Sequence, residues 1–255
     1  EGSTVRDVAA ILDRSGLVAR DDILRLSGDR SFVHSLGLHG PGLEGYLFPE
    51  TYSFERMQDG ATMLRAMVEQ FRRHLPEGWR ESEKTLGRST HDLVILASIV
   101  EKEAVADRER PIIAGVFLNR LRLDMPLQSD PTAVYDLPDF SGPVTAEHLK
   151  RHSPYNTYTI KGLPAGPICN PGEKSLEAAF HPEKTSYLYF VSNNDGTHRF
   201  SNTIAEHQQA VNRYREQRNA MKARPRSDPA THGVALLEKK GREVNVKSEL
   251  AHHQE

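Results

Sequence analysis

Apolar residues recur at helical spacing in several stretches of the chain, separated by polar or glycine-containing segments. This period predicts amphipathic helices over residues 4–15, 21–26, 61–75, 93–104, 111–121, 173–180 and 205–221. The first helix has clear end signals, because Thr4 and Asp7 can form a capping box and Gly16 can end the helix. Its apolar side is predicted to consist of Val5, Val8, Ile11 and Leu12.

Two short segments near the C-terminal end alternate as strands do. Residues 187–192 and 198–201 flank Asn194-Asp195-Gly196, a typical hairpin turn. Residues 46–54 are rich in aromatic side chains but contain Pro49, which favours an extended edge segment over a central strand. The predicted fold class is therefore α+β, with a helical core, a small antiparallel β-hairpin or sheet, and long ordered binding loops.

Glycine and proline divide the chain into three parts. A glycine-rich stretch at 36–45 breaks the helical pattern, so residues 1–42 are predicted to form an N-terminal helical segment and 43–221 the main domain. Within that domain, residues 126–171 lack a regular period, and a loop region of this length is usually a binding surface or disordered. Its many aromatic residues favour an ordered surface. The polar residues 222–255 are predicted to be a disordered tail.

Composition excludes several classes of protein. The 33 basic and 35 acidic side chains nearly balance, which gives no indication of binding to nucleic acid or to an anionic membrane. The single cysteine, Cys169, excludes an internal disulfide bond. No stretch approaches the roughly 18 apolar residues of a membrane span. Because the chain begins at Glu1 without methionine, we expect a processed protein or a fragment, with any membrane anchor before Glu1.

The common cofactor motifs are missing from the sequence. The 12 histidines are scattered, and one cysteine cannot form a thiolate cluster, so no metal site is predicted. No glycine-rich phosphate loop, dinucleotide fingerprint or serine-hydrolase elbow occurs. The sequence therefore predicts no cofactor.

Glu103 stands out among the acidic residues, because it lies in the most apolar run of the chain, residues 91–104. In a helix it would follow Ile99 by one turn and lie in the apolar stripe, whereas Glu101 would lie on the opposite face. Burial disfavours an ionised carboxyl group, so the pKa of Glu103 is expected to rise. A carboxyl group still protonated near neutral pH suits a general acid. The alternative is a solvent-exposed helix end, with Glu103 paired to Lys102 or to an arginine.

A second set of candidates combines carboxylates, tyrosines, amides and hydroxyls in loops or beside apolar runs. Aromatic faces can cover the apolar patches of sugar rings, and amides can bind sugar hydroxyls, so this set predicts a glycan site. The candidates are Glu44, Tyr46, Gln128, Asp130, Tyr155, Asn156, Thr157 and Asn170. Structural roles remain open: Asn156 could cap a turn, Asp130 could start one, and Glu44 could bond to backbone amides.

Several long motifs follow one another along the chain. They are LEGYLFPETY at 43–52, ASIVEKEA at 97–104, VFLNRL at 116–121, MPLQSDPT at 125–132, SPYNTY at 153–158, GLP at 162–164, PI at 167–168, NPG at 170–172, YLYFV at 187–191 and HRF at 198–200. Together they resemble the endolytic murein transglycosylase family, the YceG-like proteins also called MltG. The resemblance covers roughly residues 44–214.

The resemblance implies a bacterial enzyme that cleaves the MurNAc–GlcNAc β-1,4 bond within peptidoglycan glycan strands. It places the catalytic domain, here residues 43–221, on the periplasmic side of the cytoplasmic (inner) membrane. The family's N-terminal transmembrane anchor is not in this chain, and residues 1–42 would be a remnant next to its LysM-like module. Implied partners are the glycan strands and cell-wall synthesis enzymes such as penicillin-binding proteins.

The family's catalytic glutamate corresponds to Glu103, the second acid of Glu-Lys-Glu. A lytic transglycosylase uses the C6 hydroxyl of MurNAc as nucleophile and leaves 1,6-anhydro-MurNAc ends, so one carboxyl group can act first as acid and then as base. Positive charge that develops on the sugar needs stabilisation. The candidates for that role are Gln128, Asp130, Tyr155 and Asn156, of which the Tyr155-Asn156 pair is similar to a pair in other lytic transglycosylases.

Three alternatives stay open from the sequence. A non-catalytic peptidoglycan-binding or divisome scaffold protein would bind the cell wall without releasing a soluble product. A water-using muramidase would leave reducing ends, although no clear second carboxylate accompanies Glu103. A cytoplasmic regulator with a helical core would be compatible with the lack of an export signal in this chain.

Overall fold

The computed structural model describes residues 1–55 and 58–223. Its helices are α1 (Val5–Arg14), α2 (Arg20–Gly28), α3 (Arg30–Ser35), α4 (Gly60–Arg73), α5 (Trp79–Leu86), α6 (Thr90–Glu103), α7 (Arg110–Arg122), α8 (Ala146–Lys150), α9 (Glu173–Phe180) and α10 (Ile204–Ala223), with 3-10 turns η1 (Asp107–Glu109) and η2 (Asp130–Ala133). Strands β1 (Tyr189–Ser192) and β2 (His198–Ser201) pair antiparallel, with Phe190 opposite Phe200. The predicted α+β class is confirmed.

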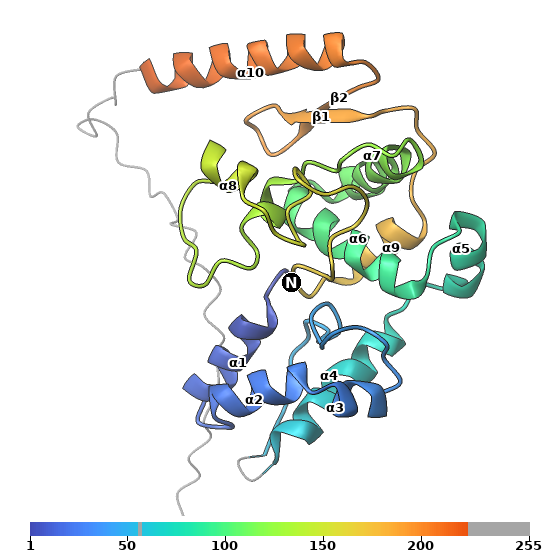
Figure 1. Ribbon diagram of the computed structural model, residues 1–255, viewed down its shortest axis with the longest axis vertical. Coiled ribbons are helices and arrows are strands. Elements are labelled where there is room, and N and C mark those ends of the chain that lie inside the picture. The colour runs from blue at the N-terminus through green and yellow to red at the C-terminus, as the bar shows by residue number, and fades with distance from the viewer. Residues whose placement is uncertain (56–57, 224–255) are drawn as a thin grey trace, which may run out of the picture.

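Figure 1 shows three groups of elements along the long axis of the molecule. Helices α1 to α4 gather at one end, where α2 contacts α1, α3 and α4. Helix α6 lies in the middle, in contact with α5, α7 and α9. At the other end, α10 packs on the β1–β2 hairpin.

Helix α6 organises the core because it is buried around its whole circumference. Every residue from Leu93 to Val100 is buried. A capping box between Ser89 and Asp92 fixes the start of the helix. The helix ends at Glu103, after which Ala104 is extended. The most apolar run of the sequence is thus a core helix, and its last residue is Glu103, which carries a carboxyl group.

Two predicted details of local structure are wrong. Residues 46–54 are not a sheet edge, because the side chains of Tyr46 and Phe48 are buried in the core and the Phe48 backbone N–H donates to the Met67 carbonyl of α4. In α1 the buried side is Val5, Ala9 and Leu12, while Ile11 is 44% exposed. Val8 is partly buried and packs against the core, so the predicted apolar side is wrong only in including Ile11 and omitting Ala9.

Helices α3 and α5 were not predicted from the sequence. Helix α3 has six residues, too few for an apolar period to be recognised. Helix α5 is mostly polar, and Ser82 is its buried residue. Both helices depend on tertiary contacts and caps, such as the Asp29 carboxylate that accepts from the Ser31 and Phe32 N–H groups.

The predicted division at residue 42 stays a prediction, although contacts cross it. Helix α4 packs on α2, and the Leu43 N–H donates to the Ser27 carbonyl. The predicted tail at 222–255 lies outside the described residues, apart from 222–223 at the end of α10. Among the described residues, no helix is both long and apolar enough to cross a bilayer.

Gly45 is a point where the packing leaves no room for a side chain. Its φ is +88°, and a Cβ atom there would lie 2.6 Å from Pro167 carbons and 2.9 Å from Val94 Cγ1 of α6. The 43–48 segment can therefore approach α6 closely only with glycine at this position.

We predict that Gly45→Ala lowers the free energy of unfolding by about 3 kcal/mol, since a left-handed backbone costs about 1–2 kcal/mol and overpacking about 1–3 kcal/mol. Gly16→Ala is the matched control, because Gly16 has φ +67° but a Cβ atom added there would meet nothing within 4 Å. Gly16→Ala should lower the free energy of unfolding by only about 1–2 kcal/mol. Urea denaturation followed by circular dichroism measures both, and equal losses would contradict the close approach.

Candidate active site

Glu103 meets the loop that leads into η2. The Ser129 hydroxyl donates to Glu103 Oε1 at 2.5 Å, and Asp130 follows directly in the chain. Glu103 is partly accessible to solvent, whereas Ser129 is buried. The Glu103 carboxyl group is therefore held by Ser129 and still partly accessible to a reacting group.

The pKa of Glu103 is raised to about 7, chiefly because burial disfavours the ionised form. The hydrogen bond from Ser129 opposes this rise, and the negative charge of Asp130 adds to it. The C-terminal end of α6 also disfavours a negative charge. The expected rise is therefore confirmed. Within the described residues Glu103 has no ion pair, and Lys102 Nζ donates instead to the Gly2 carbonyl.

Glu101 has hydrogen-bonding partners of its own, on a side of α6 that other elements cover. Its carboxylate accepts from Arg110 Nη1 at 3.3 Å, from the Ser175 hydroxyl at 2.7 Å and from the Gly172 N–H at 3.1 Å. The Glu101 and Arg110 side chains are only 8% and 9% exposed. Helices α7 and α9 cover this side of α6, so the two acids differ in their partners rather than in burial alone.

Gln128 and Asp130 are the predicted residues that the structure brings close to Glu103. Both are exposed and flank Ser129. Gln128 Oε1 accepts from Arg120 Nη2 at 2.6 Å, and the Gln128 backbone has φ +53°. A strained backbone of this kind in a non-glycine residue is often found at functional sites.

Tyr158 and Arg120 complete this group and were not selected from the sequence. The Tyr158 hydroxyl donates to Asp130 Oδ1 at 2.5 Å, and burial raises the pKa of Tyr158 well above its usual range, which keeps the hydroxyl protonated. Arg120 lies over the Tyr189 ring, 5.5 Å from its centroid. Ser129, Tyr158 and Arg120 all occur inside family-like motifs, and Tyr158 is also one of the aromatic residues of the 126–171 segment; no other sequence signal marks Ser129 or Arg120.

Thr157 and Asn156 are buried structural residues rather than direct substrate contacts. Thr157 Oγ1 accepts from the Ser129 N–H at 3.0 Å and bonds to the Thr132 hydroxyl. The Asn156 amide donates to three backbone carbonyls, including that of Arg151 at 2.6 Å, and its oxygen accepts from the Tyr158 N–H. Neither side chain is exposed. The structure therefore corrects the predicted contact: these residues hold the loops that carry Ser129 and Tyr158.

Glu44 and Asn170 form a separate buried cluster. Glu44 accepts from the Val5 N–H at 3.0 Å and from the Tyr135 hydroxyl at 2.8 Å. Burial raises its pKa to about 7. Asn170 Oδ1 accepts from the Gly45 and Leu47 N–H groups. The hydrogen bonds of Glu44 therefore support a structural role for this residue. Asn170 likewise has no free hydrogen-bonding group left for a sugar.

Tyr46 and Tyr155 each have aromatic contacts of their own. The Tyr46 hydroxyl bonds to His91 Nδ1 at 2.6 Å, and Tyr46 is buried against Phe71. Tyr155 packs against Tyr135, with ring centroids 4.6 Å apart. The predicted substrate contact of Tyr46 is therefore corrected to a packing position in the core, whereas that of Tyr155, which is partly exposed, stays a prediction.

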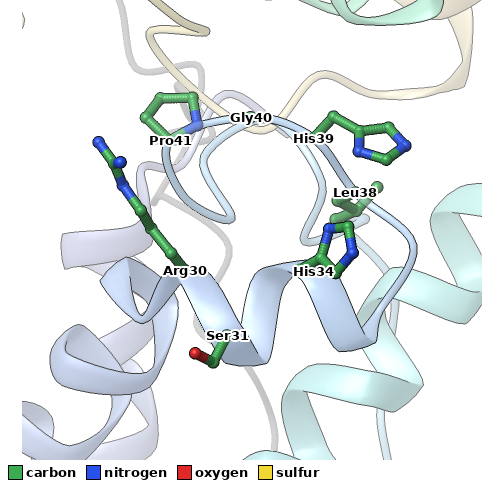
Figure 2. A pocket seen from close by; sticks show the side chains of 7 residues that line it. All are labelled: Arg30, Ser31, His34, Leu38, His39, Gly40 and Pro41. Carbon is green, nitrogen blue, oxygen red and sulfur yellow. The ribbon is translucent and has the colours of Figure 1, made fainter.

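A cleft of about 540 Å³ lies between α1 and residues 130–144, beside the group formed by Glu103, Gln128, Ser129 and Asp130. Lys102 and Asp130, the chain neighbours of Glu103 and Ser129, line it. A second hollow, of about 630 Å³, lies between α3 and residues 38–41. Figure 2 shows Arg30 and His34 on the side of α3 that faces this loop.

The second hollow lies near the opposite end of α6. A Cβ at Gly40, which lines the hollow, would lie 3.0 Å from His91 in the first turn of the helix. The 14 residues of α6 span about 20 Å at 1.5 Å per residue. Of the two hollows, the 540 Å³ cleft is therefore the one next to the end of α6 that carries Glu103.

Comparisons with known proteins point to one family. The model of the YceG-like family matches residues 1–213. A Bacillus subtilis protein named endolytic murein transglycosylase is 35% identical over 234 residues, which is 86% of this chain and 65% of that protein. A Streptococcus pneumoniae protein of the same name is 33% identical over 175 residues, 66% of this chain and 32% of that protein. The chain thus spans less than two thirds of these curated relatives.

A solved structure supports the same relationship. The crystal structure of a YceG-like protein from Listeria monocytogenes matches with a TM-score of 0.73 and 36% identity. The match covers 82% of this chain and 73% of that protein. The chain therefore shares its fold with a YceG-like protein.

We predict that Ser129→Ala raises the pKa of Glu103 above about 7, because the lost hydrogen bond stabilises the ionised carboxylate. NMR titration of carbon-13-labelled glutamate carboxyl groups measures the change. Ser175→Ala is the matched control, since Ser175 donates to Glu101 instead. An unchanged Glu103 midpoint in Ser129→Ala would contradict the bond.

Proposed function

The chain belongs to the YceG-like family, and we propose that it is a lytic transglycosylase that cleaves the MurNAc–GlcNAc β-1,4 bond within peptidoglycan glycan strands. The observation that carries this proposal is Glu103, a carboxyl group with a pKa raised to about 7 beside a cleft. The names of the B. subtilis and S. pneumoniae relatives support the substrate class.

The first chemical step needs a proton on the leaving oxygen. Protonated Glu103 donates its proton to the glycosidic oxygen while the bond from that oxygen to the muramyl anomeric carbon breaks. Ser129 holds the carboxyl group in place during the transfer. Proton transfer of this kind supplies typically about 10²–10⁴-fold in rate, so the positive charge on the sugar must also be stabilised.

The second step uses the same carboxyl group as a base. The Glu103 carboxylate accepts the proton of the muramyl C6 hydroxyl as its oxygen bonds to the anomeric carbon. The product is a 1,6-anhydro-MurNAc end, no water is consumed, and Glu103 returns to its protonated form. Asp130 is exposed beside Glu103 and is the proposed carboxylate that stabilises the positively charged sugar. Gln128 is the proposed hydrogen-bonding group on the other side of Ser129.

The position of Asp130 also favours a second candidate, a water-using muramidase. Glycosidases commonly use two carboxyl groups that flank the scissile bond. Asp130 lies near enough to Glu103 for its charge to raise the pKa of that residue. A muramidase would leave reducing ends, which differ in mass by one water from anhydro ends.

The finer cellular proposals rest on the family alone. We propose that the enzyme acts on the periplasmic side of the cytoplasmic membrane and cooperates with penicillin-binding proteins.

We predict that Glu103→Gln keeps the fold and reduces release of anhydro-muropeptides from purified sacculi by about 10²-fold or more, because the amide cannot donate the proton. Mass spectrometry of the products measures the loss and separates anhydro ends from reducing ends. Asp130→Asn serves as the comparison. If Glu103→Gln kept full activity and Asp130→Asn lost it, the general acid would be Asp130. Reducing ends in the products of the wild-type chain would support the muramidase.

We predict that kcat/KM falls as pH rises through about 7, since the first step needs protonated Glu103. Above that midpoint kcat/KM should fall by about tenfold for each further pH unit. Glu44 has a similarly raised pKa, so its ionisation also removes folding stability as pH rises through about 7. Thermal unfolding at each pH, with Glu44→Gln as a control for that effect, separates the two causes. Activity that keeps rising to about pH 9, two units above that midpoint, would exclude Glu103 as the acid.

A further inference from the structure

The cleft beside Glu103 carries both signs of charge over a partly apolar lining. Its cations are Arg6, Arg20 and Lys102, and its anions are Asp7, Asp130 and Asp139. Apolar side chains from both walls lie between them, among them Ala10 of α1 and Val134, Leu137 and Val144 of the facing segment. A ligand that fits this lining has small apolar groups together with carboxylate and ammonium groups.

None of the three cations forms a salt bridge with an acid within the described residues, although the charge of Arg6 acts on Glu44. Arg6 donates to the backbone carbonyls of Tyr135 and Leu137, and Lys102 Nζ donates to the Gly2 carbonyl at 2.8 Å. Arg20 has no ion pair in the described part of the chain. Because carbonyl groups are neutral, the positive charges stay available to a carboxylate ligand.

The aromatic rings of the cleft do not offer a platform for a sugar. Arg6 lies over the Tyr135 ring, 5.6 Å from its centroid, and the Tyr135 hydroxyl is bonded to Glu44. Phe140 meets the His148 ring edge to face at 5.0 Å. The Tyr135 ring thus has Arg6 and Tyr155 as neighbours already, and a stacking sugar would have to displace one of them.

Two residues that line the cleft are chain neighbours of the hydrogen-bonded pair Glu103 and Ser129. Lys102 immediately precedes Glu103, and Asp130 follows Ser129, which donates to Glu103. In the proposed reaction the muramyl ring sits at Glu103, and a short peptide stem branches from that ring. The stem has small apolar side chains, carboxylates and an amino group on its diamino acid. A volume of about 540 Å³ is in the usual range for ligand sites.

We infer that this cleft binds the peptide stem of the muramyl residue being cleaved, with Arg20 and Lys102 as carboxylate-binding residues. The inference rests on the proposed function, because it assigns a branch of the same substrate. It makes the enzyme selective for glycan strands that still carry peptides.

The test compares two substrates: uncross-linked glycan strands that carry stem peptides, and the same strands after an amidase has removed the stems. The wild-type chain should have a higher kcat/KM on peptide-bearing strands. Arg20→Gln and Lys102→Gln should each lower the ratio of the two kcat/KM values about fivefold, as expected for the loss of one charged contact in a partly exposed cleft. Arg25→Gln on the same helix and Lys84→Gln are matched surface controls that should keep the ratio.

Two results would overturn the inference: equal kcat/KM on both substrates for the wild type, or an unchanged ratio in both cleft variants. Failure of the proposed function looks different, because the wild type would then release no product from either substrate. In that case, titration of amidase-released stem peptide into the Glu103→Gln protein, followed by NMR, decides the question. Binding that Arg20→Gln and Lys102→Gln weaken would support the cleft as a peptide site, and no binding would overturn it.

Discussion

The Glu103 carboxyl group is held where a negative charge is disfavoured, at the C-terminal end of a helix whose body is buried on every side. The packing of α5, α7 and α9 around α6 creates this environment. The Ser129 hydroxyl gives the carboxyl group a fixed orientation without supplying a positive charge. The same burial that stabilises the fold therefore keeps a proton on the acid near neutral pH, which is the property that the proposed chemistry needs.

Glu101 and Glu103 have opposite roles although they are two residues apart. Glu101 is matched by Arg110 from α7 and by Ser175 from α9, so it ties three helices together at one end of the core. Glu103 points toward the η2 loop and has no cation beside it among the described residues. Removing one partner of a buried ion pair is strongly destabilising, whereas Glu103 has no such partner to lose. The fixed charge thus anchors the end of α6, and the unpaired acid next to it is available for chemistry.

The long segment at 126–171 shows how buried polar side chains can serve a site without touching a substrate. Asn156 bonds to the carbonyls before it, and Thr157 binds the loop that carries Ser129. Asn170 secures Gly45 and Leu47 in the same way. A loop of this length has many backbone groups that need partners once buried. Amides and hydroxyls in this segment mainly supply those partners, which leaves Gln128 and Asp130 exposed beside Glu103.

Local signals in the sequence determined the long helices, the hairpin turn at Asn194, the capping box of Thr4 and Asp7, and the raised pKa of Glu103. These features depend on neighbours within a turn or on the apolar character of one helix. Tertiary structure alone decided which groups meet: Ser129 and Glu103 are 26 residues apart, and Tyr135 and Glu44 are 91 apart. Helical period cannot reveal such contacts, nor that α9 would cover Glu101, because they depend on how separate elements pack against one another.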